Sequence, residues 1–263
     1  MYNSLNKTTL ITGGISGIGF AIAKKAAQDK NTLILVQRRN SDTAEKELKA
    51  LGAKDVIQLS FDLSELKNIH LLVSEIEKRR LNIDILINNA GLLTGGLLEE
   101  QDPEKIFQMI NVNLSAVVIL TRLLLPSMLK RKSGKIVNNA SVSGKMSMPC
   151  ASTYAASKAG VVAFTDSIRQ ELEGTGLSTL LLITPGVKTD MYDDIFNQYG
   201  DHMDLSFLKS MPAEDWANLV WSAIKSDQTV LMPSGTERFG VWLSTYAPSL
   251  FEKSIKKYFK RKL

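Results

Sequence analysis

The chain has 263 residues, of which 44% are hydrophobic, and these numbers allow one sizeable core without disulfides or metal ions. Its single cysteine, Cys150, excludes an intramolecular disulfide framework, and the N-terminus does not resemble a secretory signal, so a cytoplasmic location is expected. The net charge of +5 equals the excess of six lysines and arginines over one glutamate within residues 251–263. The remainder is neutral, which argues against a nucleic-acid groove.

Short apolar strands alternate with helices along the chain. Strands are expected at residues 8–12, 32–37, 55–62, 83–89, 134–141, 178–185 and 229–233. Helices are expected at residues 20–29, 41–52, 64–80, 103–130, 154–173 and 213–225. Continuous apolar strands joined through helices predict an α/β fold, namely a Rossmann-like, doubly wound parallel sheet of about seven strands with helices on both faces.

No internal repeat, linker or low-complexity segment interrupts this order, so a single domain is expected over residues 1–263. The most apolar run, Leu114 to Leu129, contains Arg122 and Pro126 and is shorter than about 20 apolar residues, so it predicts a buried helix rather than a membrane span. The one long irregular insert, at about 189–212, lies before the last main helix, where a lid over a site is expected.

The segment TGGISGIG, residues 12–19, joins a predicted strand to a predicted helix, which is the setting of a dinucleotide-binding turn. Gly13 permits the tight bend, Gly17 lets the backbone approach a pyrophosphate, and Gly19 lets helix and sheet pack closely. The first amides of the helix then bind the anion. The residues assigned to the cofactor here are Gly13, Ser16, Gly17, Ile18 and Gly19. The alternative is a glycine-rich turn with a purely structural role.

Two arginines follow the second predicted strand, where the adenosine ribose of a dinucleotide is expected. A carboxylate there would favour NAD(H), whereas this chain has the neutral Gln37 followed by Arg38 and Arg39. The guanidinium fork matches phosphate oxygens, so the pattern predicts NADP(H) in preference to NAD(H), with a solvated basic loop as the alternative. Asp62, at the end of the third predicted strand, is expected to reach the adenine amino group or to cap the helix that begins near Ser64.

A phenol and an ammonium lie four residues apart in YAASK, Tyr154 to Lys158, and again in YFKRK, Tyr258 to Lys262. Each pair also follows a hydroxyl by thirteen residues, Ser141 in the first case and Thr245 in the second, so spacing does not separate them. Ser141 closes a predicted strand and Thr245 closes none, and ligands bind at the carboxyl edge of a parallel sheet. The first pair is therefore assigned to a site and the second to a solvated face.

Several motifs occur in the order typical of one family: TGGISGIG, NNAG at residues 88–91, VNLS with Asn113, then Ser141, YAASK, and Pro185 with Gly186. By these motifs the chain resembles the short-chain dehydrogenase/reductase family over about Thr8 to Pro233. The resemblance implies an oxidoreductase that transfers hydride between a nicotinamide and a carbonyl or alcohol carbon. It also implies a homodimer or homotetramer.

The resemblance further implies four catalytic roles. Tyr154 is the general acid/base and Lys158 is its electrostatic partner and a ligand of the nicotinamide ribose. Ser141 holds the substrate oxygen, and Asn113 is part of a proton relay through water. An ammonium about 4 Å from a phenol, at an effective dielectric constant of about 20, contributes roughly 4 kcal/mol and would lower the phenol pKa from near 10 to near 7. The structural alternatives are a helix hydrogen bond for Asn113 and a strand cap for Ser141.

The resemblance assigns further residues to the cofactor, along the sheet edge and after the sixth strand. They are Asn89, Ala90, Gly91, Tyr154, Lys158, Pro185, Gly186 and Thr189. Thr189 would meet the nicotinamide carboxamide, although only two residues separate it from Gly186, where the family commonly has three.

Flexible apolar residues between Ser141 and Tyr154, and within the expected lid, predict a pocket for a hydrophobic carbonyl or secondary alcohol, or else a part of the core. They are Met146, Met148, Cys150, Met191, Ile195, Phe196, Met203, Phe207 and Leu208. Cys150 is expected to be a small buried side chain. His70 and His202 lack partners at metal-ligand spacing, so no metal site is predicted.

Beside its lysines the basic tail, residues 251–263, carries four apolar side chains at near-helical spacing: Phe251, Ile255, Tyr258 and Phe259. The tail is expected to pack as a solubilising helix on its own domain or a neighbour, or to dock on acidic lipid. Apolar helical segments at residues 117–125 and 161–164 agree with a homo-oligomer.

The sequence therefore predicts an NADP(H)-dependent oxidoreductase that reduces a hydrophobic carbonyl compound, the reductive direction being inferred from the arginines alone. The rival prediction is a cofactor-binding sensor or scaffold that uses the same fold without turnover.

Overall fold

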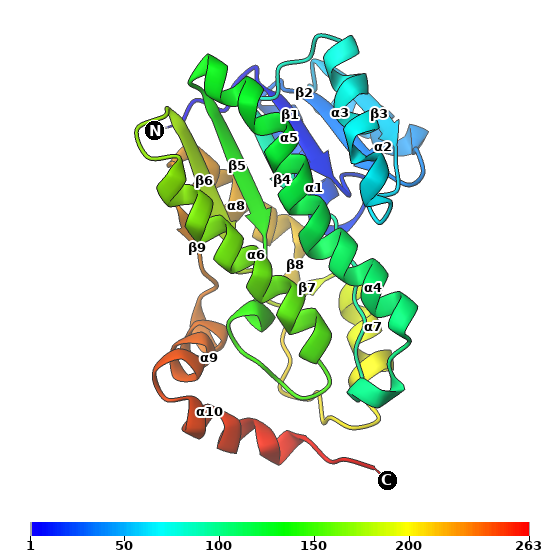
Figure 1. Ribbon diagram of the computed structural model, residues 1–263, viewed down its shortest axis with the longest axis vertical. Coiled ribbons are helices and arrows are strands. Elements are labelled where there is room, and N and C mark those ends of the chain that lie inside the picture. The colour runs from blue at the N-terminus through cyan, green and yellow to red at the C-terminus, as the bar shows by residue number, and fades with distance from the viewer. Residues whose placement is uncertain (1, 263) are drawn as a thin grey trace.

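Seven parallel strands form the central sheet of the computed structural model, which describes residues 2–262 (Figure 1). Their order is β3-β2-β1-β4-β5-β6-β9. The strands are β1 Thr8–Thr12, β2 Thr32–Gln37, β3 Asp55–Ser60, β4 Ile85–Asn88, β5 Gly134–Asn139, β6 Leu177–Leu182 and β9 Val230–Leu231. The predicted doubly wound α/β fold is confirmed. Met1 and Leu263 lie outside the described residues. They are the two ends of the expected domain, and Leu263 is also the end of the expected tail.

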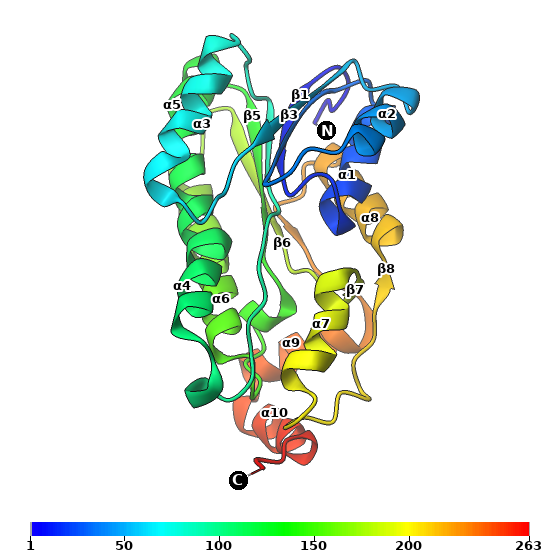
Figure 2. The same cartoon turned by 90° about the vertical axis from the view of Figure 1, so that its right-hand side faces the viewer.

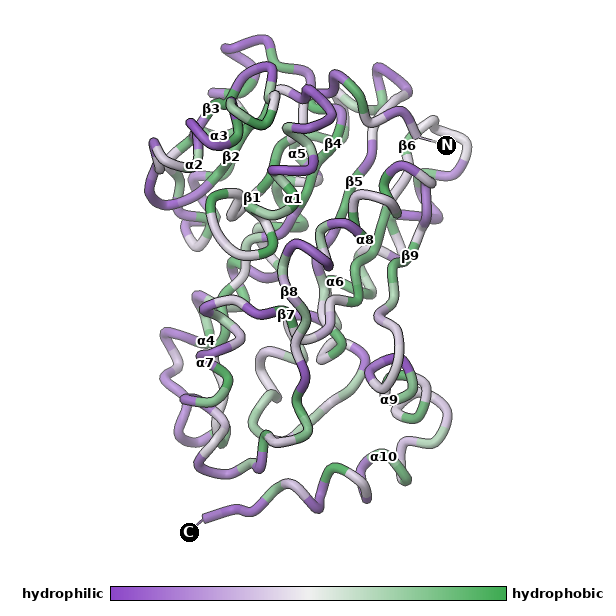
Figure 3. Tube along the Cα trace, turned by 180° about the vertical axis from the view of Figure 1, so that it is seen from behind, coloured by the Kyte–Doolittle hydropathy of each residue, from purple (hydrophilic) through white to green (hydrophobic). Residues whose placement is uncertain are grey.

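Helices cover both faces of this sheet. The α-helices are α1 Gly17–Gln28, α2 Asp42–Ala50, α3 Ile69–Lys78, α4 Pro103–Ile110, α5 Ala116–Arg131, α6 Ser152–Glu171, α7 Asp190–Tyr199, α8 Ala213–Lys225, α9 Gly235–Tyr246 and α10 Pro248–Ile255. Figure 2 shows α1, α2 and α8 on one side of the strands and α3, α5 and α6 on the other. Strands covered on both faces are mostly apolar along their length, and in β2 the run from Leu33 to Val36 is fully buried. The strands are mostly coloured as hydrophobic in Figure 3.

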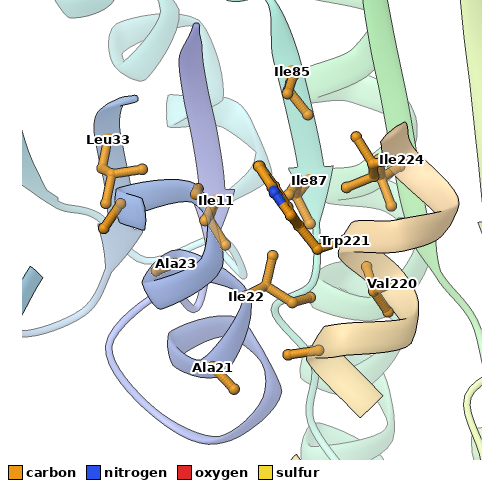
Figure 4. Close-up of a cluster of buried hydrophobic side chains, with 14 of the residues drawn as sticks. Ile11, Ala21, Ile22, Ala23, Leu33, Ile85, Ile87, Val220, Trp221 and Ile224 are labelled. Carbon is orange, nitrogen blue, oxygen red and sulfur yellow. The ribbon is translucent and has the colours of Figure 1, made fainter. Parts of the chain in front are cut away.

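Aliphatic and small side chains join the sheet to α1 and α8 (Figure 4). Ile11 of β1 and Ile87 of β4 lie in the same buried cluster as Ile22 of α1, and none of the three is exposed to solvent. Val220 and Trp221 of α8 complete the contact. Each side chain of this size contributes about 1.5–3 kcal/mol when it is removed from water, so this cluster anchors the helix that follows the glycine-rich turn.

The long helix predicted at 103–130 is found as α4, a π-helical turn at Asn111–Ser115 and α5. By length and composition this stretch is able to cross a membrane, a test that the core helix of a soluble protein also passes. Its buried residues Leu120, Leu124 and Met128 belong to the core on the α3 side of the sheet. The stretch therefore packs as the buried helix that the sequence predicts.

The expected lid, residues 189–212, was predicted to be irregular, but it has regular structure. It contains α7, and its ends are joined by two short parallel strands, β7 Val187–Lys188 and β8 Met211–Pro212. The side chain of Thr189 accepts a hydrogen bond from the backbone N–H of Tyr192 and so caps α7, a feature readable from the sequence TDMYDD. The segment is thus a folded insertion whose two ends are held together by the β7–β8 pair.

Residues 235–258 fold into two helices and a 3₁₀ turn, η5 Lys256–Tyr258, of which α9 was not predicted. The apolar side chains of the tail point into the protein, because Phe251 is buried and the Tyr258 ring lies 4.6 Å from that of Phe207, between centroids. The assignment of the Tyr258 to Lys262 pair to a solvated face is therefore wrong for Tyr258, while Lys262 is exposed. The tail packs on its own domain, as one of the open alternatives stated.

Candidate active site

A ladder of polar side chains runs along the carboxyl edge of the four central strands. The Thr12 hydroxyl, at the end of β1, accepts from the backbone N–H of Asn89 at 2.9 Å, and the Asn89 amide oxygen accepts from Asn139 at 3.0 Å. The Asn139 side-chain oxygen accepts in turn from Thr184, and its backbone oxygen accepts from Lys158 at 2.8 Å. The carboxyl ends of the four central strands are thereby linked to one another. They lie beside the point between β1 and β4 at which the strand order reverses, and ligands of such sheets bind at this point.

The glycine-rich turn lies at this same edge and has the backbone that its sequence predicts. Gly13 and Gly17 have φ of +66° and +51°, a region that other residues rarely adopt. A Cβ on Gly19 would lie 2.1 Å from the carbonyl oxygen of Gly13, so only glycine allows helix α1 to approach the turn this closely. Within residues 2–262 no side chain forms a cap hydrogen bond with the first turn of α1, so its first amides are available to a ligand. This cradle fits a pyrophosphate.

The charged residues predicted to meet the adenosine end are exposed near the carboxyl ends of β2 and β3. Arg38 and Arg39 are exposed and have no ion-pair partner among residues 2–262. Asp62 accepts from the backbone N–H and the hydroxyl of Ser64, at 2.9 and 2.8 Å. It does not cap an α-helix, because α3 begins only at Ile69, after a 3₁₀ turn.

Ser141, Tyr154 and Lys158 meet where β5 ends and α6 begins. Ser141 follows β5, and its hydroxyl is close enough to the Tyr154 phenol to lower the phenol pKa. It also accepts from the backbone N–H of Ser143 at 3.1 Å, so the structural role as a cap coexists with the contact to the phenol. Lys158 lies one helical turn after Tyr154 on α6 and is buried. The three groups therefore share one wall of the site, and Thr245 lies in α9, away from any strand.

The Tyr154 pKa does not lie near 7 as expected from the sequence. Lys158 Nζ lies 5.9 Å from the centroid of the Tyr154 ring and donates to the backbone oxygen of Asn139. Burial raises the pKa of Tyr154 to about 12, although the Ser141 hydroxyl lowers it, and burial lowers the pKa of Lys158 to about 8. The phenol is accordingly a proton donor at neutral pH, and the ammonium is close to its titration range.

Asn113 lies in the π-helical turn between α4 and α5, a local widening that often occurs at functional sites. Its amide accepts from the backbone N–H of Leu92 at 2.8 Å and donates to the backbone oxygen of Leu92 at 2.9 Å and to Ser157 at 3.1 Å. The side chain thus braces the segment after β4 against α6. Gly91 lies between the side chains of Asn113 and Lys158, since a Cβ on Gly91 would be 3.3 Å from Asn113 Oδ1 and 3.7 Å from Lys158 Nζ.

A cavity of about 1030 Å³ runs from the glycine-rich turn past Tyr154 to the C-terminal helices. Of the residues predicted to form an apolar pocket, seven line it: Met146, Met148, Met191, Ile195, Met203, Phe207 and Leu208. Phe196 is instead exposed, and Cys150 is buried in a neighbouring cluster as expected of a small side chain.

Several lining residues were not predicted. Tyr199, at the end of α7, and Leu243 of α9 both face the cavity, and so does Tyr258. The helical spacing of apolar residues in GTERFGVWLSTY was the available signal for α9. No sequence signal places that helix against a cavity whose other wall is formed about 100 residues earlier in the chain.

The segment after β6 brings the remaining predicted residues to the cavity. Pro185, Gly186 and Thr189 all line it, beside Asn89, Ala90 and Gly91 on the opposite side of the turn. Thr189 lies next to the glycine-rich turn, because a Cβ on Gly17 would be 3.1 Å from its methyl group. The shortened spacing after Gly186 therefore still leaves Thr189 at the site, where its hydroxyl caps α7.

A family model described as short chain dehydrogenase matches residues 7–200. The chain belongs to the short-chain dehydrogenase family. Its members are oxidoreductases that bind a nicotinamide cofactor, and the glycine cradle described above fits such a group.

Named relatives in the short-chain dehydrogenase family include two reductases. The ketoacyl reductase HetN of Nostoc sp. is 39% identical over 227 residues, covering 85% of this chain and 77% of that protein. The 3-oxoacyl-[acyl-carrier-protein] reductase FabG of Haemophilus influenzae is 33% identical over 208 residues, covering 79% and 83%. A crystal structure of a short-chain dehydrogenase from Streptomyces avermitilis has the same fold, with a TM-score of 0.79, 24% identity and 97% of both chains covered.

Proposed function

We propose that this short-chain dehydrogenase is an NADP(H)-dependent reductase of a hydrophobic carbonyl compound. The observation that carries the proposal is the common wall formed by Ser141, Tyr154 and Lys158 in an apolar cavity that begins at the glycine-rich turn. A sensor or scaffold would not need a buried ammonium beside a protonated phenol, because burying each of them costs stability.

The proton chemistry follows from the ionisation states. With its pKa raised to about 12, Tyr154 is a neutral phenol at pH 7 and donates its proton to a carbonyl oxygen that becomes negative. Ser141 hydrogen-bonds the same oxygen and fixes its position against the phenol. Lys158, held by Asn139, stabilises the phenolate that remains. When bound, the nicotinamide would supply the hydride, and the glycine-rich turn together with these residues would hold the cofactor.

Asn113 acts as a positioning residue in this proposal. Both N–H groups of its amide donate, to Leu92 and Ser157, and its oxygen accepts from Leu92, so it holds the backbone after β4 and the first turns of α6 in register. The water relay implied by the family resemblance stays a prediction.

The preference for NADP(H) over NAD(H) is supported by the charges at the end of β2. Arg38 and Arg39 are exposed there, without carboxylate partners among residues 2–262, and the preceding Gln37 is neutral. A planar guanidinium binds a phosphate through paired hydrogen bonds, and no acidic group at this position favours an unmodified ribose.

The substrate class is proposed from the cavity and the relatives together. Its far half is lined by methionine, leucine, isoleucine and aromatic side chains, which suit an apolar chain attached to the reacting carbonyl. The two relatives described above are named as a ketoacyl reductase and a 3-oxoacyl-[acyl-carrier-protein] reductase. A 3-oxoacyl thioester or another ketone with an apolar chain is therefore the proposed substrate.

Four further expectations stay predictions: the single domain over 1–263, the lid role of 189–212, the homo-oligomer and the cytoplasmic location.

The test is NADPH oxidation with a panel of 3-oxoacyl thioesters, apolar ketones and quinones, with NADH in parallel. Tyr154→Phe is expected to lower kcat by about 10²- to 10⁴-fold with NADPH binding retained, because only the donated proton is removed. Tyr246→Phe, which alters an exposed tyrosine, is the matched control and should leave the rate unchanged. NADPH binding without turnover across the panel would favour the sensor.

The cofactor preference has its own test. The double variant Arg38→Ser with Arg39→Ser is expected to weaken NADPH binding about 10- to 100-fold, since a hydrogen bond to a charged group contributes about 1.5–3 kcal/mol, and to leave NADH binding nearly unchanged. Arg122→Ser with Lys130→Ser removes the same charge from exposed positions on α5 and serves as the control. Equal losses for NADPH and NADH would contradict the phosphate role.

A further inference from the structure

A row of large apolar side chains is exposed on α9 and the start of α10. Its members, called here the aromatic row, are Phe239, Trp242, Tyr246 and Leu250, which are 61%, 52%, 73% and 62% exposed. The Phe239 and Trp242 rings stack with centroids 5.9 Å apart, and those of Trp242 and Tyr246 are also 5.9 Å apart. The three aromatic residues therefore form one continuous strip on one face of α9, which the protein itself leaves uncovered.

A cluster of lysines follows this row directly. While Phe251 and Tyr258 face the cavity, Lys253, Lys256, Lys257 and Lys260 are exposed, and none of the four has an ion-pair partner among residues 2–262. Arg261 and Lys262 differ, because Arg261 pairs with Glu99 and Lys262 lies 4.0 Å from Asp201. Glu252 is the one acidic residue within this stretch.

The cavity reaches the aromatic row. Phe239 belongs both to the row and to the cavity lining, together with Leu243 and Phe251 from the same two helices. Figures 1 and 2 show α9 and α10 at the end of the molecule beyond the carboxyl edge of the sheet. Whatever covers the row therefore also lies against the mouth of the cavity.

We propose that the aromatic row and the four unpaired lysines dock this protein on an anionic membrane surface, with the cavity opening toward the lipid. Tryptophan, tyrosine and leucine beside lysines are the composition of segments that lie in the membrane interface. Each lysine near an anionic leaflet strengthens the attraction, so charge and apolar surface favour the same partner. The inference concerns docking and does not depend on turnover.

Two other occupants fit these features less well. A second copy of the chain, placed around a two-fold axis, would bring its own lysines against these, and like charges repel. An acidic protein would attract the lysines, but lysine is depleted at the buried centre of protein interfaces. Both remain outcomes of the test.

Trp242 is a built-in reporter for this contact. The protein has three tryptophans, and Trp216 and Trp221 are 0% and 5% exposed, so a change in emission on docking comes from Trp242. With vesicles of phosphatidylcholine and phosphatidylserine, we expect a blue shift, quenching by brominated lipid, and co-sedimentation. Binding should be much weaker with phosphatidylcholine alone, and should fall at 1 M salt, where the screening length drops to about 3 Å.

Two variants with matched controls separate the contributions, measured by co-sedimentation. Lys253→Gln with Lys256→Gln and Lys257→Gln should weaken binding about 100-fold, at about fivefold for each lysine near the surface. Its control removes the same charge elsewhere, by Lys54→Gln, Lys67→Gln and Lys78→Gln, which are exposed positions.

The apolar part is tested in the same way. Trp242→Gln with Leu250→Gln should weaken binding about 100-fold or more, because each of the two large apolar side chains contributes about 10-fold or more on leaving water. Leu71→Gln with Leu219→Gln, at exposed positions of α3 and α8, is the control. Neither Trp242 nor Leu250 lines the cavity, so the rate on a soluble substrate should be unchanged.

Three results would overturn the proposal. The first is no binding to anionic vesicles at low salt, or equal losses in variants and controls. The second is an emission shift that grows with protein concentration in the absence of vesicles, which would assign the row to a second copy. The third is binding to soluble polyglutamate as tight as to vesicles, without quenching by brominated lipid, which would assign the surface to an acidic protein.

Discussion

Burial decides which proton Tyr154 and Lys158 carry at neutral pH. The pKa of the phenol is raised to about 12 and that of the ammonium is lowered to about 8, both mainly by burial. A protonated phenol is the form that reduction needs. The ammonium is the group whose charge is lost first as the pH rises, because its titration range lies nearer neutrality.

The residue-scale prediction is therefore a pH dependence. In the reductive direction kcat/KM should fall as the pH rises above about 8, because neutral Lys158 no longer stabilises the phenolate of Tyr154. Tyr154 itself stays protonated below about pH 12 and adds no further decline in this range. The measurement is a pH–rate profile from pH 6 to 10. Lys158→Arg, which stays charged throughout, should lack the decline, and a flat wild-type profile to pH 10 would refute this assignment.

At the scale of elements, α7 depends on a close contact with the loop after β4. A Cβ on Gly95 would lie 1.8 Å from Cε1 of Tyr199, the buried last residue of α7. The ring of Tyr199 also lines the cavity, so the position of α7 and the shape of the substrate pocket are set by the same contact. Only glycine at position 95 allows it.

Gly95→Ala is expected to displace the Tyr199 ring and to raise the substrate KM, with a loss of about 1–3 kcal/mol in stability from overpacking. NADPH binding should be little changed, because the glycine-rich turn is not touched. Steady-state kinetics and thermal unfolding measure the two effects. In a Tyr199→Leu background the overlap is relieved, so the same substitution should cost less there; additive effects in this cycle would contradict the proposed contact.

At the scale of the whole molecule, one buried carboxylate joins three distant parts of the chain. Asp29, just after α1, accepts from the Ser4 hydroxyl at 2.5 Å, from Trp221 at 2.9 Å and from Lys225 at 3.0 Å. It thereby ties the segment before β1 and helix α8 to the end of α1. Burial raises the pKa of Asp29, but the hydrogen bonds from Ser4, Lys225 and Trp221 outweigh it, so the pKa lies below its ordinary value.

Asp29→Asn should lower the free energy of unfolding by about 1–3 kcal/mol at pH 7, since charge-assisted hydrogen bonds are lost. Because the pKa of Asp29 is lower in the folded state, its contribution is fully present above the unfolded value of about 3.9 and is lost as the pH falls through the folded value. The difference between wild type and variant should thus be constant from about pH 8 to 5 and shrink below pH 4. Urea unfolding across this range measures it, and a difference independent of pH would argue against the charge.

The positions of the strands, the glycine-rich turn and the Tyr154–Lys158 pair were readable from the chain itself. Apolar runs between helical segments predict a parallel sheet, and a group that follows a strand must lie at the carboxyl edge, so Ser141 could be placed before any coordinates. The positive φ of Gly13 and Gly17 agrees with their expected roles in the turn. The backbone conformation of single residues and the spacing of apolar residues determine these features, and both depend only on residues close together in the chain.

Packing between distant segments decided the rest. The direction in which Tyr258 points, the wall that α9 and Tyr199 add to the cavity, and the ionisation of Tyr154 and Lys158 all depend on what surrounds each group in space. The pKa near 7 expected from the sequence considered only the attraction of the lysine, whereas burial of both groups raises the pKa of Tyr154 and lowers that of Lys158. The sequence by itself determined the sheet and the order of its functional groups, because these follow from local periodicity. Only the tertiary structure determined burial, and burial sets the pKa values and the shape of the pocket.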